Sequence, residues 1–411
     1  MGRGQNGQNS TPNGLLALGC ALAQSLRLRV VNMQIVSKYK FYLIALAIWA
    51  LAVTAKYKFQ GLVYGFDYGT YQPDGKFYTY MTLDFLNQNP VQSAQQVVDW
   101  YLIHGYKMNT FTIQDLMPET SYAYPVISHR ILYPLLSVPF VALFGIPGML
   151  AIPALSLLAL FFAIQLLANK LNKPLIGLGV IVILSFSTTV MRWMVVNCTD
   201  ALLVGLFAFL PLVLLREFKS NIFRIAALCT LILLTSATRF VLPFWLAIIL
   251  VLLFRERRRL ESLLLIVFSV TSALPALSAQ LSTALLPADQ ESPTLIKLLK
   301  LPIAFVRVSG IDFLQFGVLD RVFLLFLVFC LIQAVRLYRR VSSQLFLAVM
   351  FAGYTIGAIN GTLGVNFRYQ IPVLVFASWV VLDSFDIKTS GLRLVPAIKG
   401  DVIVNETEQK L

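Results

Sequence analysis

Residues 148–168 read GMLAIPALSLLALFFAIQLLA, a run of 21 residues without a charged side chain. A helix of about 20 apolar residues is long enough to cross the hydrocarbon core of a bilayer. The composition of the whole chain agrees with this run. Of its 411 residues, 58% are hydrophobic and only 13% are charged, and the mean hydropathy is +0.76. These values predict an all-α protein that crosses a membrane several times.

Similar apolar runs recur along the chain, and together they predict about ten transmembrane helices. The other nine cover about 39–55, 174–191, 200–215, 222–237, 239–254, 261–284, 319–336, 342–360 and 369–385. Residues 131–147 are also apolar, but the segment is short and contains Pro134 and Pro139. We therefore interpret it as a broken or re-entrant segment rather than a straight span.

The formal net charge of +14 follows from basic loops on one side of the membrane. In a soluble protein this charge would indicate nucleic-acid binding, but here the membrane topology explains it and we expect no nucleic-acid partner. If 131–147 does not cross, the basic loops fall on one side, which the positive-inside rule makes cytoplasmic together with both termini. These segments are 38–40, 169–173, 216–224, 255–261 and 336–341. Loops 56–130 and 285–318 then face outward. If 131–147 did cross, every later loop would invert.

The chain divides into three predicted parts. Residues 1–32 form a low-complexity tail that is disordered or dispensable, 33–386 form the membrane domain, and 387–411 form a cytoplasmic tail. Within outward loop 56–130, Val97, Val98, Tyr101 and Leu102 have helical spacing, which predicts a helix lying on the bilayer.

Several kinds of chemistry leave no pattern in the sequence. The four cysteines show no paired spacing, and the two histidines lie far apart. P-loop, GxGxxG, HExxH, CxxC and GxSxG motifs are absent. We therefore expect no cofactor, while dependence on a divalent metal stays open.

The first outward loop contains FDYGTYQPDGKFYTY at residues 66–80, with Asp67 and Asp74 close to the expected membrane surface. Pro73-Asp74-Gly75 is typical of a tight turn. Such a turn can simply reverse the chain, or it can present a carboxylate that accepts a proton from a substrate hydroxyl. Asp74 is our main candidate for that base, and Asp67 is its rival.

Arginines recur at the predicted outward ends of the spans, where an ionisable group needs a partner or a function. Arg192 and Asp200 flank one outward turn, and we expect an ion pair there more than a substrate role. Arg239 and Arg368 have no acidic neighbour in sequence, which suggests an anionic partner such as a phosphate. Arg130 and Arg192 are weaker candidates for phosphate or donor binding. Each arginine could instead be an interfacial anchor.

Taken in order, four motif regions resemble the GT-C superfamily of integral-membrane glycosyltransferases. The motifs are PDGKFY (73–78), RILYPLL (130–136), NCTDALL (197–203), and the pair SATRFVLP (236–243) and NFRYQIP (366–372). The nearest subgroup is the mannosyltransferase-like enzymes of the type that adds the second mannose to GPI anchors, with their bacterial relatives. Pro73 departs from the aromatic residue usual in the first motif, and no second acid adjoins Asp74.

The resemblance implies an inverting enzyme that moves a sugar from a polyprenyl-phosphate donor to an acceptor hydroxyl on the outer membrane face. The first-loop aspartate would act as base, and arginines would hold the departing phosphate. Tyr78 and Tyr369, which lie in the motifs, and Asp200 would contact the acceptor or orient charged groups. The acceptor would be a lipid or glycan, and mannose is the expected sugar by analogy.

Three alternatives remain at the level of sequence. The protein could transfer another lipid-linked group, it could be a transporter or flippase of lipid-linked glycans, or it could bind such lipids without catalysis. A transporter would be expected to carry polar groups in mid-span and an internal repeat, and neither pattern is evident.

Overall fold

The structure is a computed structural model that describes residues 39–59, 63, 74–87, 89–104, 111–121, 123–218, 220–256, 259–284, 301–359 and 367–385, with only the backbone of 280–284. Regular structure in these residues is helical throughout, and no strand occurs among them. The predicted all-α fold class is therefore confirmed. The two predicted tails, 1–32 and 387–411, lie outside the described residues, as does Asp67.

Several helices are long and apolar enough to cross a bilayer, which supports a multi-pass integral membrane protein. Within the described ranges there are five, or six if the bent pair α8 (Pro174–Phe186) and α9 (Thr188–Met194), which meet at 78°, counts as one span. The five are Tyr39–Lys58, Ile146–Lys170 (η2, Ile146–Leu150, with α7, Ala151–Lys170), Arg259–Ala279 within α14 (Arg259–Ala284), α16 (Leu301–Leu319) and α18 (Val341–Ile359).

The remaining apolar runs form shorter helices. They are α10 (Asp200–Phe207) with α11 (Leu210–Leu214), α12 (Asn221–Ser236), α13 (Leu242–Glu256), α17 (Arg321–Arg336) and α19 (Val373–Ser384). The ends of each lie within four residues of the predicted ends. The count of ten spans stays a prediction, because several of these helices are shorter than the roughly 20 residues of a straight crossing.

The segment predicted to be broken forms α6 (Leu132–Phe144), an apolar helix of 13 residues with Pro139 inside it. It ends at Gly145, whose φ of +68° lies in the left-handed region that glycine adopts without a steric penalty. The chain then continues directly into η2. A straight 13-residue helix rises only about 20 Å, too little for the hydrocarbon core. Its re-entrant course stays a prediction.

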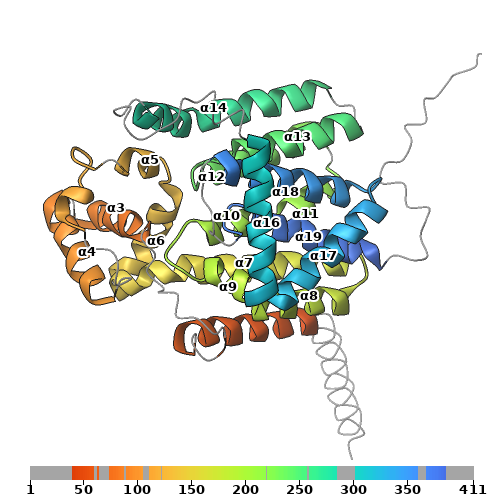
Figure 1. The fold of residues 1–411 in the computed structure, drawn as a ribbon, viewed down its shortest axis with the longest axis horizontal. Coiled ribbons are helices and arrows are strands. Elements are labelled where there is room, and N and C mark those ends of the chain that lie inside the picture. Colours follow the sequence, from red (N-terminus) through yellow and green to blue (C-terminus); the bar gives the residue numbers. More distant parts are fainter. Residues whose placement is uncertain are drawn as a thin grey trace, which may run out of the picture.

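The described residues of the loop that was predicted to face outward form several helices. They include α3 (Gly75–Asn87), α4 (Pro90–His104), η1 (Ile113–Asp115) and α5 (Tyr124–Ser128), which gather with α6 beside the main bundle (Figure 1). The helix predicted from the spacing of Val97, Val98, Tyr101 and Leu102 is α4. Val97 and Tyr101 are buried inside the protein, whereas Leu102 is 68% exposed, so only part of the predicted apolar face is free to lie on a bilayer.

Residues 285–318 were predicted to form one long outward loop. The prediction is wrong for residues 301–318, which belong to helix α16. The rest of that loop lies outside the described residues. Arg307 and Asp312 interrupt the apolar run, which made it read as a loop. In Figure 1, α16 runs across the other bundle helices, and it packs on α17 and α18.

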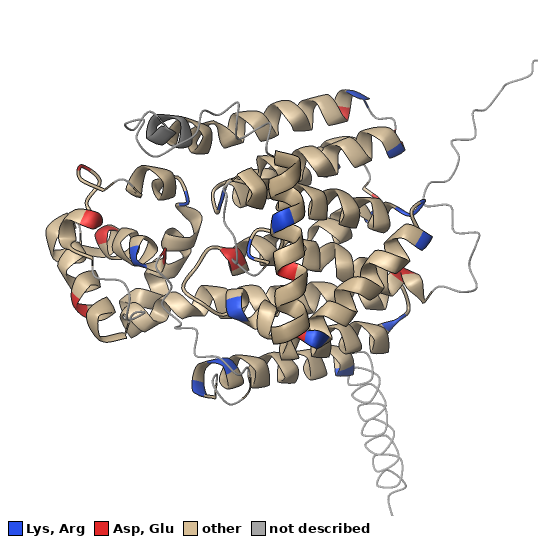
Figure 2. Ribbon diagram, in the orientation of Figure 1, with Lys and Arg blue, Asp and Glu red and all other residues tan. Residues whose placement is uncertain are grey.

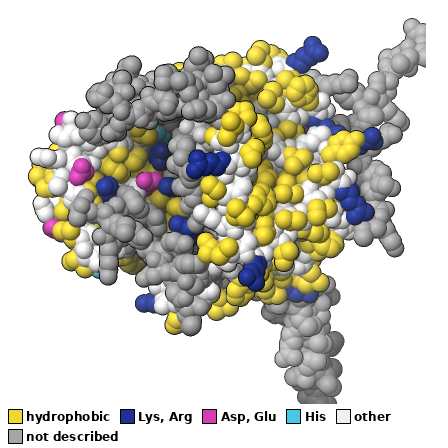
Figure 3. Space-filling view, viewed as in Figure 1, with side chains coloured by type: hydrophobic (Ala, Val, Ile, Leu, Met, Phe, Trp, Pro, Cys, Tyr) yellow, Lys and Arg dark blue, Asp and Glu magenta, His cyan; other side chains and the backbone are white. Residues whose placement is uncertain are grey.

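The main bundle is built around α19. Its residues from Val373 to Leu382 are all buried, because α19 packs against α7, α8, α17 and α18. Hydrophobic side chains cover much of the visible outer face of the bundle (Figure 3), as expected for a surface in contact with lipid. Many Lys and Arg residues lie at helix ends away from α3 and α4 (Figure 2).

Asp320 joins two helix ends inside the bundle. Its Oδ1 accepts a hydrogen bond from the Phe323 backbone N–H (3.0 Å), which caps α17. Its Oδ2 accepts from the Ser187 hydroxyl (2.7 Å) and the Thr189 backbone N–H (2.8 Å), which fixes the start of α9.

We expect Asp320→Ala to lower the free energy of unfolding by about 2–4 kcal/mol, since a cap is lost and buried donors lose their acceptor. Thermal unfolding of the purified protein in detergent measures the change. The control is Asp99→Ala, which removes an exposed carboxylate from α4. Equal unfolding midpoints for the two variants would contradict this role.

Candidate active site

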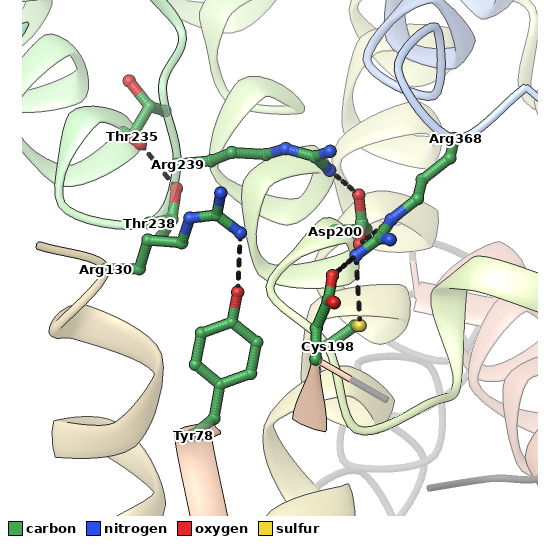
Figure 4. Close-up of polar contacts among 9 residues, drawn as sticks. Tyr78, Arg130, Cys198, Asp200, Thr235, Thr238, Arg239 and Arg368 are labelled. Atoms are coloured by element: carbon green, nitrogen blue, oxygen red, sulfur yellow. Dashed lines mark hydrogen bonds and ion pairs between the residues drawn. The ribbon is translucent and has the colours of Figure 1, made fainter. Parts of the chain in front are cut away.

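Five charged side chains from distant parts of the chain form one cluster beside the group of helices α3–α6. Asp74 directly precedes α3, Arg130 precedes α6, Asp200 is the first residue of α10, Arg239 follows α12 and Arg368 precedes α19 (Figure 4). All five were predicted from the sequence as separate candidates. The fold brings them together because the helix ends that carry them meet at the boundary between the α3–α6 group and the bundle.

Asp200 is the centre of this cluster. Its side chain has no exposed surface, and its two oxygens contact different arginines. Oδ1 pairs with Arg239, and Oδ2 accepts a hydrogen bond from Nε of Arg368 at 3.2 Å. A carboxylate buried this deeply is tolerated only when it is paired and hydrogen-bonded.

Arg368 links the two carboxylates. Its Nη2 donates to Asp74 Oδ2 at 2.6 Å, while its Nε holds Asp200. The same Nη2 lies 3.5 Å from Cys198 Sγ, and the guanidinium carbon lies 4.9 Å from the ring centre of Trp193. Burial raises the pKa of Cys198 to about 12, so this thiol stays protonated beside the arginine.

Asp74 is the carboxylate that remains accessible, with 35% of its side chain exposed. Burial on its own would raise the pKa of Asp74, but Arg368, Arg130 and Arg239 together hold that pKa below its ordinary value of 3.8. The group is therefore ionised at neutral pH. Oδ2 is bound to Arg368, whereas no hydrogen bond to Oδ1 occurs within the described part of the chain.

Arg130 differs from the other two arginines because its contact is with a neutral group. Its Nη1 donates to the Tyr78 hydroxyl at 2.9 Å, and its buried Nε has no partner within the described ranges. Burial raises the pKa of Tyr78, so the phenol stays neutral. Burial and the charge of Arg130 lower the pKa of His129 to about 4, so this neighbouring ring is neutral too.

The charges of the cluster do not balance. Among the described residues of the cluster, three guanidinium groups (Arg130, Arg239 and Arg368) face two carboxylates (Asp74 and Asp200), which leaves one surplus positive charge. The ion pairs locate that surplus at Arg130. Basic and acidic side chains gather at the hollowed boundary between the α3–α6 group and the bundle (Figure 3). This arrangement favours a ligand that brings one negative charge.

The ion pairs differ from those that the local sequence suggests. Arg239 and Arg368, for which an anionic partner such as a phosphate was predicted, both pair with Asp200. The expected pair of Arg192 with Asp200 does not form, because Asp200 Oδ1 and Oδ2 are taken by the other arginines. Arg192 instead lies 5.3 Å from the ring centre of Trp193. Residues distant in sequence supply the partners, so local sequence could not reveal them.

The predicted tyrosines orient arginines. Tyr78 accepts the hydrogen bond from Arg130, and the ring centre of Tyr369 lies 4.8 Å from the guanidinium carbon of Arg239. Among the described residues, no group of three or more His, Cys, Asp or Glu side chains could hold a metal ion. Dependence on a divalent metal stays untested.

Asn197 is a supporting residue that the sequence did not single out. Its amide nitrogen donates to the Tyr101 hydroxyl (2.9 Å) and the Thr79 hydroxyl (3.0 Å), and its Oδ1 accepts from the Tyr133 hydroxyl (2.7 Å). These bonds tie α3, α4 and α6 to the segment before α10. A polar side chain inside NCTDALL was the available signal, but its partners could not be read from it.

Comparison with family models, with curated proteins and with solved structures finds no match to this chain.

Asp74 should make stability depend on pH in a defined direction. Its folded-state pKa lies below 3.8, so the ionised form stabilises the fold above that value, and this contribution disappears as pH falls through the lowered pKa. We expect wild type to be more stable than Asp74→Asn at pH 7, with the difference closing below about pH 4. Unfolding midpoints in detergent from pH 3 to 7 measure it, with exposed Asp99→Asn as control. A gap that persists unchanged at pH 3 would contradict the assignment.

Gly75 should tolerate no side chain. A Cβ there would lie 2.5 Å from the backbone oxygen of Asn197 and 2.9 Å from the Tyr101 hydroxyl. We expect Gly75→Ala to displace Asp74 and to destabilise the protein by about 1–3 kcal/mol through overpacking. Gly310→Ala, where a Cβ meets nothing within 4 Å, is the matched control. Wild-type stability in Gly75→Ala would show that the two backbones can separate at little cost.

Proposed function

We propose that the protein is a GT-C-like membrane glycosyltransferase that moves a sugar from a polyprenyl-phosphate donor to an acceptor hydroxyl, with inversion at the sugar carbon. The observation that carries this proposal is the surplus guanidinium of Arg130 beside the accessible, ionised carboxylate of Asp74. One displacement at a sugar carbon needs a base for the nucleophile and a cation for the leaving group. The cluster supplies both.

The proposed roles follow from the contacts. The acceptor oxygen attacks the sugar carbon while its proton passes to Asp74, and the bond from carbon to the phosphate oxygen breaks with its electron pair. Arg130 stabilises the charge that develops on the departing phosphate. Arg239 and Arg368, both neutralised by aspartates, hold Asp74 and Asp200 in place more than they bind substrate. Asp67 stays the rival base, and Arg192 is a weaker candidate for donor contact.

The surplus charge of the cluster also supports a donor with one negative charge. A lipid-phosphate sugar is a phosphodiester with about one negative charge, which equals the surplus of one positive charge at the site. Mannose is proposed by analogy with the GT-C resemblance alone. The acceptor is a lipid or glycan hydroxyl that the site meets from the membrane surface.

The proposed topology places this site on the outer face of the membrane. It comprises about ten spans within 33–386, a re-entrant 131–147 segment, and cytoplasmic N- and C-termini. The gathering of Lys and Arg residues at helix ends away from α3 and α4 supports this orientation through the positive-inside rule. The charged cluster lies beside α3, at the opposite end.

Transfer activity should depend on Asp74 and Arg130. Purified protein in detergent would be incubated with radiolabelled polyprenyl-phosphate mannose and a lipid extract as acceptor. We expect Asp74→Asn to lower the rate roughly 10²–10⁴-fold because the base is lost. Arg130→Gln should lower it roughly 100-fold or more because the phosphate loses its cation. Exposed Arg255→Gln, at the end of α13, is the control.

The remaining outcomes separate the alternatives. Loss in Asp67→Asn but not in Asp74→Asn would move the base to Asp67 and keep the class of enzyme. Product from another lipid-phosphate sugar, but not from the mannose donor, would change the sugar. No product with any donor, together with lipid binding that survives in Asp74→Asn, would overturn the enzyme proposal in favour of a transporter, flippase or lipid-binding protein.

A further inference from the structure

Asp312 is an acidic side chain in the middle of α16, a helix apolar enough to span the membrane. Only 1% of its surface is exposed. A carboxylate at such a position is costly and therefore needs a compensating contact. It belongs to no cluster described above, and its Oδ2 has no hydrogen bond within the described residues.

The contact that Asp312 does make leads to the candidate active site. The carboxylate is hydrogen-bonded to the backbone of Phe367, the residue directly before Arg368. Phe367 has a φ of +66°, in the left-handed region that non-glycine residues rarely adopt. Such a conformation persists only where the surroundings enforce it. A hydrogen bond from the Phe367 N–H to the Asp312 carboxyl group is one such constraint.

The Phe367 ring supplies a second constraint. Its side chain is 1% exposed, and it packs edge-on against Phe316 and Phe323, with ring centres 5.6 and 5.1 Å apart. Phe316 lies one turn after Asp312 on α16. The same helix therefore holds both the backbone and the side chain of the residue before Arg368.

The other side of the turn is held by α18. Gln370 is fully buried, and a Cβ added at Gly353 would lie 3.1 Å from both the Gln370 Cα and the Tyr369 carbonyl oxygen. A Cβ at Gly357 would lie 3.5 Å from the Gln370 amide nitrogen. The turn 367–370 thus lies between α16 and a glycine-bearing face of α18, and little room remains for it to shift.

We propose that Asp312 is a positioning residue: by holding the Phe367 backbone it sets the place of the Arg368 guanidinium between Asp74 and Asp200. The effect on transfer rests on the proposed function, but the effect on the position of Arg368 does not. Asp312 touches no substrate in this proposal. A displacement of about 1 Å in a group that positions others can cost roughly 100-fold in rate.

The first measurement of the test, the labelling of a single cysteine, does not depend on enzymatic activity. In a full-length chain carrying Cys20→Ser, Cys229→Ser and Cys330→Ala, the remaining thiol is Cys198, which is buried and lies 3.5 Å from Arg368. Its maleimide labelling rate in the folded protein reports the packing around Arg368. Arg368→Gln shows how the rate changes when the guanidinium is lost.

We expect Asp312→Leu to change the Cys198 labelling rate in the same direction as Arg368→Gln. Asp312→Asn, which keeps an oxygen acceptor for the Phe367 N–H, should label like wild type. Gly353→Ala, which places a methyl group of α18 against the turn 367–370, should change the labelling rate in the same direction as Asp312→Leu. It replaces Asp312→Leu in the test if that variant does not fold. Ser309→Ala, one turn earlier on α16, is the control.

In the transfer assay, Asp312→Leu should lower kcat/KM roughly 10–100-fold, mostly through kcat. In the Arg368→Gln background, the same substitution should lower the rate little further. Asp312→Asn should restore activity to within a few fold of wild type. Unchanged Cys198 labelling in both Asp312→Leu and Gly353→Ala, or equal damage from the asparagine and leucine variants, would overturn the proposal. Wild-type protein without transfer activity but with the expected labelling pattern would count against the proposed function alone.

Discussion

Asp200 has no exposed surface, and it divides its two carboxylate oxygens between Arg239 and Arg368. Three helix ends depend on this contact, because Asp200 begins α10, Arg239 follows α12 and Arg368 precedes α19. The pairing compensates charges that would each be costly to bury alone. A change at any one of the three leaves another uncompensated, so the bundle and the site cannot be varied independently here.

The same network determines where the accessible carboxylate lies. Arg368 is held on one side by Asp200 and on the other donates to Asp74 at 2.6 Å. Asp74 is thereby placed by the bundle as well as by its own helix. Neutral contacts reinforce the placement: Asn197 bonds to α3, α4 and α6, and the Leu132 N–H donates to the Ala237 carbonyl at 3.1 Å. The α3–α6 group is therefore held against the bundle by several contacts that surround one charged cluster.

Much of the fold could be predicted from the sequence, because each apolar run reports directly on a helix. The run at 148–168 lies within η2 and α7, and Pro134 and Pro139 predicted an interrupted segment where the short helix α6 lies. The prediction failed at α16, where Arg307 and Asp312 interrupt the run although Asp312 is buried in the fold. In the site, residue types at span ends identified the five charged members. Their pairing could not be predicted, because it joins residues far apart in sequence, such as Asp74 and Arg368.

The position and charge of the cluster together limit what it can do. Charges at helix ends need not be carried through the hydrocarbon core, and this position agrees better with the proposed reaction at the membrane surface than with a transport cycle. Two of its arginines are already neutralised, and Arg130 is held by a neutral phenol. A half-buried cation in this state gains most from an anionic ligand, since no carboxylate within the described residues is hydrogen-bonded to it. That ligand would lie beside Asp74, whose own charge is retained by Arg368. In the proposed function, the site would therefore bind an anion and keep Asp74 as its base, and this combination distinguishes a catalytic site from a simple anion-binding site.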